Sequence, residues 1–389
     1  MKIAVIAQLL SNIVSLMLIF MAGREETRQV FVSSQLIVSY LSLIGFSHFG
    51  LIDGQYQRLI EGVDREIYFN LIKRYVFVVG FTIAACLILL YFKRQVNYSL
   101  VLLVIISAVM VNTQAFFYSM VNGLGRSEVY FKALIVEKVF SLIFLVCIIL
   151  GLIKDENWAL TWIPLSGFIN LIALYAIKKA NKIEIPRVIK EIGIIQDVKK
   201  GVGIMISNIT YTAPIALTAL ISSQLIESKD DLTMQLLAIS ISSTLVSYFV
   251  QLSLVVISNS QKKMDCEFCE NIRSRFNIKV LLMLFIMLPF VMLNLFESNS
   301  GLNYLIFTLV MLAPYVIAES YNNLCILPAI KVKGEVKRIM RVNLLCFLLY
   351  IFVCCLWVLG MDNYHYGLVG AISIASIARI QMLKNGYFA

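Results

Sequence analysis

The chain has 389 residues, of which 60% are hydrophobic and 14% are charged, and its formal net charge is +10. Soluble domains are nearer half apolar and one-quarter charged, so this composition excludes an ordinary cytosolic enzyme, a secreted disulfide scaffold and a disordered chain. No long polar stretch leaves room for a large soluble domain. We therefore predict an all-α polytopic membrane protein.

Twelve apolar runs are long enough to cross a bilayer, which takes about 20 helical residues. The first run follows Lys2 and lacks the small-residue cleavage site of a signal peptide, so we expect it to be retained. The tenth run is the longest and is expected to tilt, or to be interrupted near Pro314 or Pro328. The predicted spans are 3–22, 30–52, 75–92, 98–121, 133–153, 158–177, 201–224, 232–257, 278–296, 302–330, 342–361 and 366–383.

Loop charges predict the orientation of these spans. With the N-terminus in the cytoplasm, 27 of the 33 lysines and arginines fall on the cytoplasmic side and six on the other. Cytoplasmic loops of membrane proteins carry such an excess. We therefore predict that both termini are cytoplasmic, and we attribute the basic balance to this bias rather than to binding of nucleic acid.

The chain divides into two predicted bundles of six helices, 1–180 and 201–389, joined by a cytoplasmic linker over 181–200. The start of the second bundle resembles the start of the first at an offset of 200 residues. An even number of spans separates the two copies, which gives parallel halves. Parallel halves are typical of transporters whose substrate site lies between them.

A polar stripe recurs in the first and seventh predicted spans. Its members are spaced i, i+3 and i+4, which places them on one helix face. A polar face on an apolar span should contact the protein interior or a water-filled cavity rather than lipid. The stripe consists of Gln8, Ser11 and Asn12 in the first span and of Asn208, Tyr211 and Thr212 in the seventh.

Charged residues inside the spans are the other candidates. Glu319 lies deep in the tenth span with Asn322 one turn on, and a carboxylate at that depth is a functional candidate by default. A neutral glutamate hydrogen-bonded within the bundle is the alternative. Glu137 and Lys138, at the start of the fifth span, are expected to be charges at the membrane interface rather than site residues. Arg379 is near enough to the end of its span to reach the membrane surface.

Two further candidates lie at the cytoplasmic end. His48 closes the second span, where a histidine is either a packed, hydrogen-bonded residue or a proton switch. Arg58 belongs to the segment 53–74, which mixes basic and apolar residues as an amphipathic helix on anionic headgroups does. A solvated connector is the alternative for this segment.

Motifs of catalysis are missing from the sequence. It has no P-loop, no HExxH and no GxSxG, and its two histidines are far apart. We predict that the protein is not an enzyme and has no catalytic residues, metal site or cofactor.

Two short segments carry a family resemblance. His48-Phe49-Gly50-Leu51-Ile52-Asp53-Gly54 and Asn122-Gly123-Leu124-Gly125-Arg126, together with twelve spans in a 6+6 arrangement, resemble the Wzx-type O-antigen flippases of the multidrug/oligosaccharidyl-lipid/polysaccharide (MOP) exporter superfamily. The resemblance covers nearly the whole chain as architecture. Its local motifs are short and degenerate.

The resemblance implies a bacterial inner-membrane protein that translocates an undecaprenyl-diphosphate-linked oligosaccharide. The partners it implies are this lipid-linked oligosaccharide, membrane lipids and a coupling ion, H+ or Na+. Members of the family commonly line the cavity with Arg and Lys, whereas the first and seventh spans here have no central basic residue. The candidate cavity residues are Gln8, Asn12, His48, Arg58, Asn208, Tyr211, Glu319 and Asn322.

Two other functions compete with this hypothesis. O-antigen polymerases also have many spans, but they resemble one another in carrying a sizeable periplasmic loop. The long loops of this chain lie on the predicted cytoplasmic side, which is rich in Lys and Arg and argues against a polymerase. A multidrug/cation antiporter of the same superfamily is expected to carry an acidic residue in its first span. Residues 3–22 contain none, although Glu319 could serve in the other half.

Overall fold

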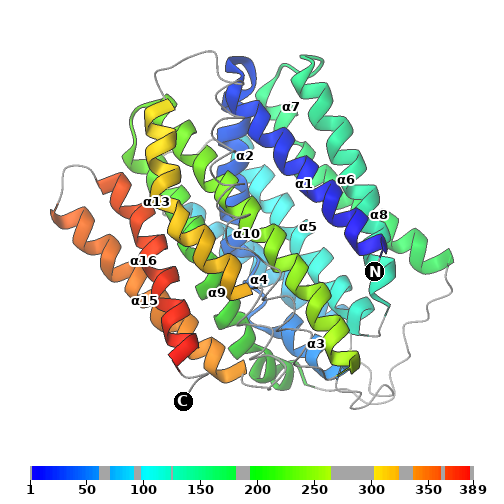
Figure 1. Cartoon of the computed structure of the whole chain (residues 1–389). Coiled ribbons are helices and arrows are strands. Elements are labelled where there is room, and N and C mark those ends of the chain that lie inside the picture. The colour runs from blue at the N-terminus through cyan, green and yellow to red at the C-terminus, as the bar shows by residue number, and fades with distance from the viewer. Residues whose placement is uncertain are drawn as a thin grey trace. The chain divides into compact units, whose positions relative to one another are not determined.

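The computed structural model describes most of the chain as helices (Figure 1). No strand occurs in the described ranges, so the predicted all-α class is confirmed. Seven of the described helices are long and apolar enough to cross a membrane. The described residues are 2–60, 71–91, 98–123, 126–180, 193–263, 302–323, 336–360 and 364–385.

The described part of each predicted span is mostly helical, although the second and sixth spans each consist of two helices separated by a turn. The ninth span, 278–296, lies outside the described residues. The helices are α1 (Lys2–Gly23), α2 (Glu25–Ile44), α3 (Leu51–Ile60), α4 (Leu71–Tyr91), α5 (Tyr98–Gly123), α6 (Ser127–Ile149), α7 (Glu156–Leu160), α8 (Trp162–Ala180), α9 (Ile194–Leu225), α10 (Lys229–Lys263), α13 (Leu302–Tyr321), α15 (Val336–Gly360) and α16 (Tyr364–Asn385).

The chain folds into two compact units. Unit 1 comprises Met1–Met17 and Leu36–Ile209, and unit 2 comprises Leu18–Gln35 and Thr210–Ala389. In unit 1, α5 packs against α3, α4, α6 and α8. In unit 2, α13 packs against α10 and α16, and α15 packs against α16, as Figure 1 also shows.

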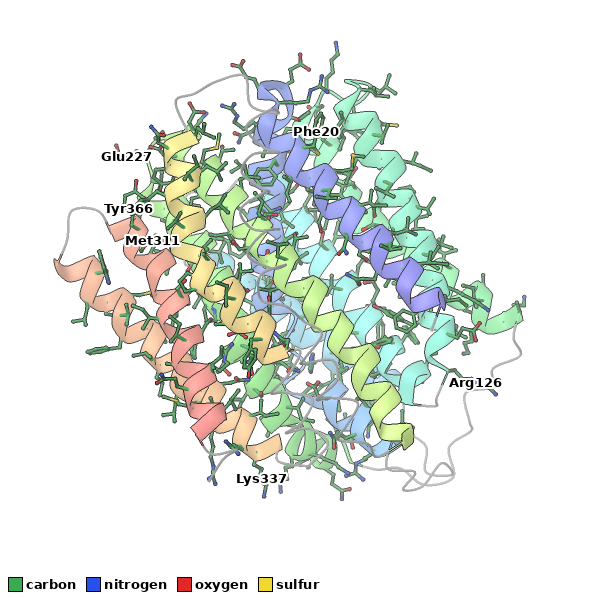
Figure 2. All side chains as sticks on the ribbon, in the orientation of Figure 1. Phe20, Arg126, Glu227, Met311, Lys337 and Tyr366 are labelled. Atoms are coloured by element: carbon green, nitrogen blue, oxygen red, sulfur yellow. The ribbon has the colours of Figure 1, made fainter. Side chains whose placement is uncertain are left out.

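The two ends of unit 2 carry different labelled side chains. Lys337, at the start of α15, lies at one end, and Glu227 and Tyr366 lie at the opposite end (Figure 2). Consecutive long helices therefore run from one end of the unit to the other, as membrane-spanning helices must.

The second predicted span is two helices rather than one. Its helix α2 ends at Ile44, and α3 begins at Leu51 after a corner in which Phe49 (φ 50°) and Gly50 (φ 82°) take left-handed backbone conformations. A β-carbon at Gly50 would also overlap the backbone of Val202. The Phe-Gly-Leu segment singled out in the sequence is thus a tight corner. The helix predicted within 53–74 is α3 in its described part, and 61–70 lie outside the described residues.

Small residues let α3 approach the beginning of α9 closely. A β-carbon at Gly54 would overlap the carbonyl of Asp197, and one at Gly201 would overlap the backbone of Gly50 and Gly54. Small residues give membrane helices this kind of close contact. The helix α9 starts at Ile194, inside the segment predicted as a linker, because Asp197 in its first turn is buried in ion pairs with arginines of α3 and α4.

A buried polar network joins α2, α4 and α5 in unit 1. The amide of Asn112 donates to Thr82 Oγ1 (2.8 Å), to Ser47 Oγ (3.3 Å) and to the carbonyl of Ile44 (3.4 Å). Ser47 and Thr82 also lie 3.1 Å apart through their hydroxyl oxygens. The network pairs the Asn112 amide nitrogen and both hydroxyl groups, which would be costly in hydrocarbon without partners, and it links the end of α2 to α4 and α5.

The tenth predicted span stays helical through Pro314. Helix α13 runs from Leu302 to Tyr321 and then widens into a π turn at Asn322 and Asn323. Pro328 lies outside the described residues. A wider turn of this kind is often found at functional sites, and here it carries two of the side chains described next.

Candidate functional site

A buried ion pair joins α13 and α16 in unit 2. The carboxylate of Glu319 on α13 is bound by the guanidinium group of Arg379 on α16. Their side chains are 0% and 4% exposed. Two opposite charges that are held together cost far less in a membrane interior than either would alone, so the pair explains why both residues occur in spanning helices.

Polar side chains from α9 and from the π turn surround this pair. Asn322 donates from Nδ2 to Glu319 Oε2 (3.3 Å), and Asn323 donates to the hydroxyl of Tyr211 (3.0 Å) and to the carbonyl of Glu319 (2.7 Å). The Arg379 guanidinium lies over the Tyr211 ring, 4.6 Å from its centroid. A cation over an aromatic face is stabilised by the ring quadrupole. We call Tyr211, Glu319, Asn322, Asn323 and Arg379 the Glu319 cluster.

Three buried polar atoms in or beside the Glu319 cluster have no hydrogen-bond partner in the described part of the chain. They are Arg379 Nε, Asn322 Oδ1 and Ser320 Oγ. One is a donor, one is an acceptor, and the hydroxyl is both. The cluster therefore combines a neutralised pair of charges with spare hydrogen-bonding capacity. It suits a polar, uncharged group such as water or a sugar hydroxyl better than a second charge.

The structure places the sequence-predicted candidates in several locations. Three of them, Tyr211, Glu319 and Asn322, come together in the Glu319 cluster of unit 2. The other five lie in unit 1. The five are Gln8, Asn12, His48, Arg58 and Asn208.

The unit 1 candidates have different surroundings. Gln8 donates to Asn12 (2.9 Å) one turn on along α1, and both side chains are half-buried, whereas Asn208 on α9 is exposed. His48 is buried at the corner after α2, where its Nδ1 accepts from the backbone N–H of Gly50 (3.2 Å). This is the packed, hydrogen-bonded alternative considered for His48. Arg58 forms an ion pair with Asp197.

Sequence reasoning missed Arg379 and Asp197 as partners. Arg379 was expected to reach the membrane surface, but the structure buries it against Glu319. A signal was available, because an isolated Arg and an isolated Glu deep in two late spans are each too costly without a partner. No comparable signal marked Asp197, which reads in the sequence as one charge among the lysines of a loop.

Glu137 on α6 is, besides Asp197, the buried acidic residue among the described residues of unit 1. It accepts from Lys138 Nζ (2.5 Å) and from the amide of Asn170 on α8 (2.6 Å). The Lys138 side chain is 22% exposed. Glu137 is 7% exposed and lies near the middle of α6, and the interfacial role stays a prediction.

No protein-family model and no curated protein matches the chain. Its fold is nevertheless similar to that of solved transporters over nearly its full length. An inward-facing multidrug resistance transporter of the MATE family, in the MOP superfamily, aligns with a TM-score of 0.66 at 12% identity, covering 99% of this chain and 97% of that one.

Two further transporters give the same result. The eukaryotic MATE transporter AtDTX14 aligns with a TM-score of 0.63 at 17% identity, covering 99% of this chain and 93% of that one. A variant of the Vibrio cholerae MATE transporter VcmN aligns with a TM-score of 0.58 at 12% identity over 100% and 97%. The chain has the fold of a MATE transporter. This fold is the one that the family resemblance of the sequence implies, and seven of the described helices are long and apolar enough to cross a membrane.

Proposed function

We propose that the protein moves lipid-linked oligosaccharides, such as undecaprenyl-diphosphate-linked O-antigen or other polysaccharide repeat units, across the bacterial inner membrane by alternating access. A polar oligosaccharide and its diphosphate cannot cross about 30 Å of hydrocarbon unaided. Burying their hydroxyls and charges without partners would be prohibitive. Two six-helix bundles that open in turn to each side provide polar partners along the path.

The pairing of the buried acidic residues with basic residues is the observation that favours this proposal over the alternatives. A transporter of cationic drugs needs a carboxylate that is free to meet the cation. Each acidic residue inside the long helices that the structure describes as buried has a basic partner instead. The pairs are Glu137 with Lys138, Asp197 with Arg58 and Arg74, and Glu319 with Arg379.

The uncharged polar face of α1 and α9 supports a sugar ligand. Gln8 and Asn12 are half-buried and Asn208 is exposed, although all three lie in apolar helices. Amide side chains offer both donors and acceptors, as sugar hydroxyls do. The free-energy cost of an exposed amide in such a helix is low only where the amide contacts water or a polar ligand.

The energy source is an ion gradient, H+ or Na+, or removal of the product by polymerisation outside. The sequence has no P-loop that could bind a nucleotide. Both sources fit a transporter that alternates between two open states without covalent chemistry.

A deletion strain tests the proposal. We expect loss of surface polysaccharide and accumulation of lipid-linked repeat units on the cytoplasmic leaflet, both restored by the wild-type gene. Surface display of single repeat units in the deletion strain would mean that translocation is intact and that the polymerase alternative holds.

The antiporter alternative has one observation in its favour, which is that the solved transporters of similar fold include multidrug resistance proteins. It is tested by drug efflux from cells that express the wild-type chain. Efflux of cationic dyes, with unchanged lipid-linked oligosaccharide in the deletion strain, would replace our proposal with this one.

A matched pair of substitutions tests the cavity face. Asn12→Ala removes an amide from the polar stripe, whereas Ile13→Ala removes an exposed apolar side chain from the next position of α1. We expect a severalfold loss of complementation for Asn12→Ala and little loss for Ile13→Ala. Equal effects of the two would remove α1 from the proposed path.

A further inference from the structure

The first turn of α9 is fastened by buried ion pairs. The Asp197 side chain is 0% exposed, and its carboxylate is bound by Arg58 from α3 and by Arg74 from α4. Arg74 is 1% exposed and Arg58 is 19% exposed. All three residues lie in unit 1.

A second ion pair joins α2 and α10 in unit 2. Arg28 Nη1 lies 2.6 Å from Asp230 Oδ1, and the two side chains are 22% and 56% exposed. The predicted topology assigns Arg28 and Asp230 to the periplasmic side and Arg58, Arg74 and Asp197 to the cytoplasmic side.

Both sets of ion pairs join the first predicted bundle to the helices α9 and α10, the first of which begins in the predicted linker. Arg28, Arg58 and Arg74 belong to the first bundle, whereas Asp197 and Asp230 lie on α9 and α10, the helices that open the second. The compact units follow these ion pairs rather than the bundles. Residues 18–35 group with unit 2, and the start of α9 groups with unit 1. Each unit thus holds a segment of the other predicted bundle by means of an ion pair.

We propose that these ion pairs are two locks of unequal strength. The cytoplasmic lock is Asp197 with Arg58 and Arg74, and the periplasmic lock is Arg28 with Asp230. Opening toward the cytoplasm requires release of the first, and opening toward the periplasm requires release of the second. This inference rests on the alternating-access part of the proposed function and not on the identity of the substrate.

The cytoplasmic lock is built so that it can separate. Its helices meet at Gly50, Gly54 and Gly201, which present backbone without interlocking side chains. Asp197 lies in the first turn of α9, where the helix dipole continues to stabilise a carboxylate after the arginines leave. Arg58 is partly exposed, so its charge has a short route to water.

The difference in burial sets the resting state. An exposed pair such as Arg28 with Asp230 contributes little to stability, whereas separating a buried pair is costly. The protein without substrate is therefore expected to open more readily to the periplasm than to the cytoplasm. A substrate loaded from the cytoplasm must then supply the free energy that releases Asp197.

A thiol reporter on the predicted cavity face tests the two locks. Asn208→Cys is introduced into the full chain after replacement of its eight cysteines by alanine. Labelling by an impermeant reagent is timed in inside-out and in right-side-out membrane vesicles. Asp197→Asn should accelerate labelling from the cytoplasmic side by about tenfold or more. Asp230→Asn should accelerate labelling from the periplasmic side by about twofold to fivefold.

The control is Glu128→Gln. Glu128 pairs with Lys132 on the predicted cytoplasmic side at 2.8 Å, but both residues belong to α6, so this pair joins no two helices. Its loss should leave both labelling rates unchanged. Where Asp197→Asn does not reach control abundance in the membrane, Arg58→Gln decides the question, because it keeps the buried pair of Arg74 with Asp197.

Unchanged cytoplasmic labelling in the decisive variant at control abundance would overturn the proposal and make Asp197 a static anchor. Because the labelling uses no substrate, the outcome is independent of what is transported. A chain that labels as expected but moves no lipid-linked oligosaccharide would retain the locks and lose the proposed substrate.

Discussion

The Glu319–Arg379 pair makes a specific prediction about stability. Glu319→Gln preserves the shape of the side chain and its bond from Asn322, but it leaves the Arg379 guanidinium buried without a counter-charge. From the sequence alone, this variant would be expected to fold normally and to lose only transport. The buried partner changes that expectation, because removing one member of such a pair typically costs about 3–5 kcal/mol.

The surroundings of Arg379 reduce this cost. The Tyr211 ring lies under the guanidinium and is worth up to about 2 kcal/mol to a desolvated cation. We therefore expect Glu319→Gln to lower the free energy of unfolding by about 2–4 kcal/mol. The double variant Glu319→Gln with Arg379→Met removes both charges and retains a long side chain on α16. Its free energy of unfolding should lie within about 1 kcal/mol of the wild-type value, since replacing a buried pair is often nearly neutral.

The assay is thermal unfolding of the four purified chains in one detergent, together with their abundance in membranes. The wild type, the two single variants and the double variant form a double-mutant cycle. Both single variants should melt clearly below the wild type, and the double variant should recover most of the difference. A double variant that is less stable than either single variant would refute the reasoning. A recovered double variant then reports on transport without a folding defect.

Three further predictions concern unit 1. Gly201→Ala should destabilise the protein by about 1–3 kcal/mol in a thermal melt, because the new β-carbon would overlap the backbone of Gly50 and Gly54. The control Gly80→Ala places its β-carbon in open space and should be neutral or stabilising. Lys154→Cys, on the predicted periplasmic side, should react with an impermeant thiol reagent in intact cells. Lys179→Cys, on the predicted cytoplasmic side, should react only after permeabilisation, and the reverse pattern would contradict the predicted orientation. Burial raises the pKa of Asp53 on α3 to about 6. The stability that its neutral form contributes is therefore complete only below about pH 4, and up to about 3 kcal/mol is lost as pH rises through 6. Asp53→Asn should flatten this part of the stability-against-pH curve, and an unchanged slope would show that Asp53 is not the group responsible.

Much of the fold follows from the sequence because hydrocarbon imposes a strict rule. A helix that crosses a bilayer needs a long apolar run, so the described helices coincide with the predicted spans. The residues at which the helices begin and end were less predictable. The helix α9 begins at Ile194 because Asp197 finds arginines on α3 and α4, and a sequence pattern contains no information about such distant partners.

The candidate site was predictable only in part for the same reason. Depth in a span identified Glu319, and helical spacing identified Tyr211, because both properties are local. The pairing of Glu319 with Arg379 depends on how α13 packs against α16. The corner at Gly50 shows the converse case, in which a motif suggested by family resemblance has a local structural explanation.

Polar residues in the spans fall into two classes, and only one of them supports transport. The amide nitrogen of Asn112 donates to Ser47 and Thr82, so the protein itself satisfies this buried donor, and packing is a sufficient reason for its presence. Gln8 and Asn208 also lie on apolar helices, but Gln8 is only half-buried and Asn208 is exposed. An amide in contact with lipid would be a net cost that no internal bond removes. A water-filled path is the simplest environment that lowers the free-energy cost of the exposed Asn208 amide, so this amide adds to the support that the paired acidic residues give to the proposal of a polar substrate.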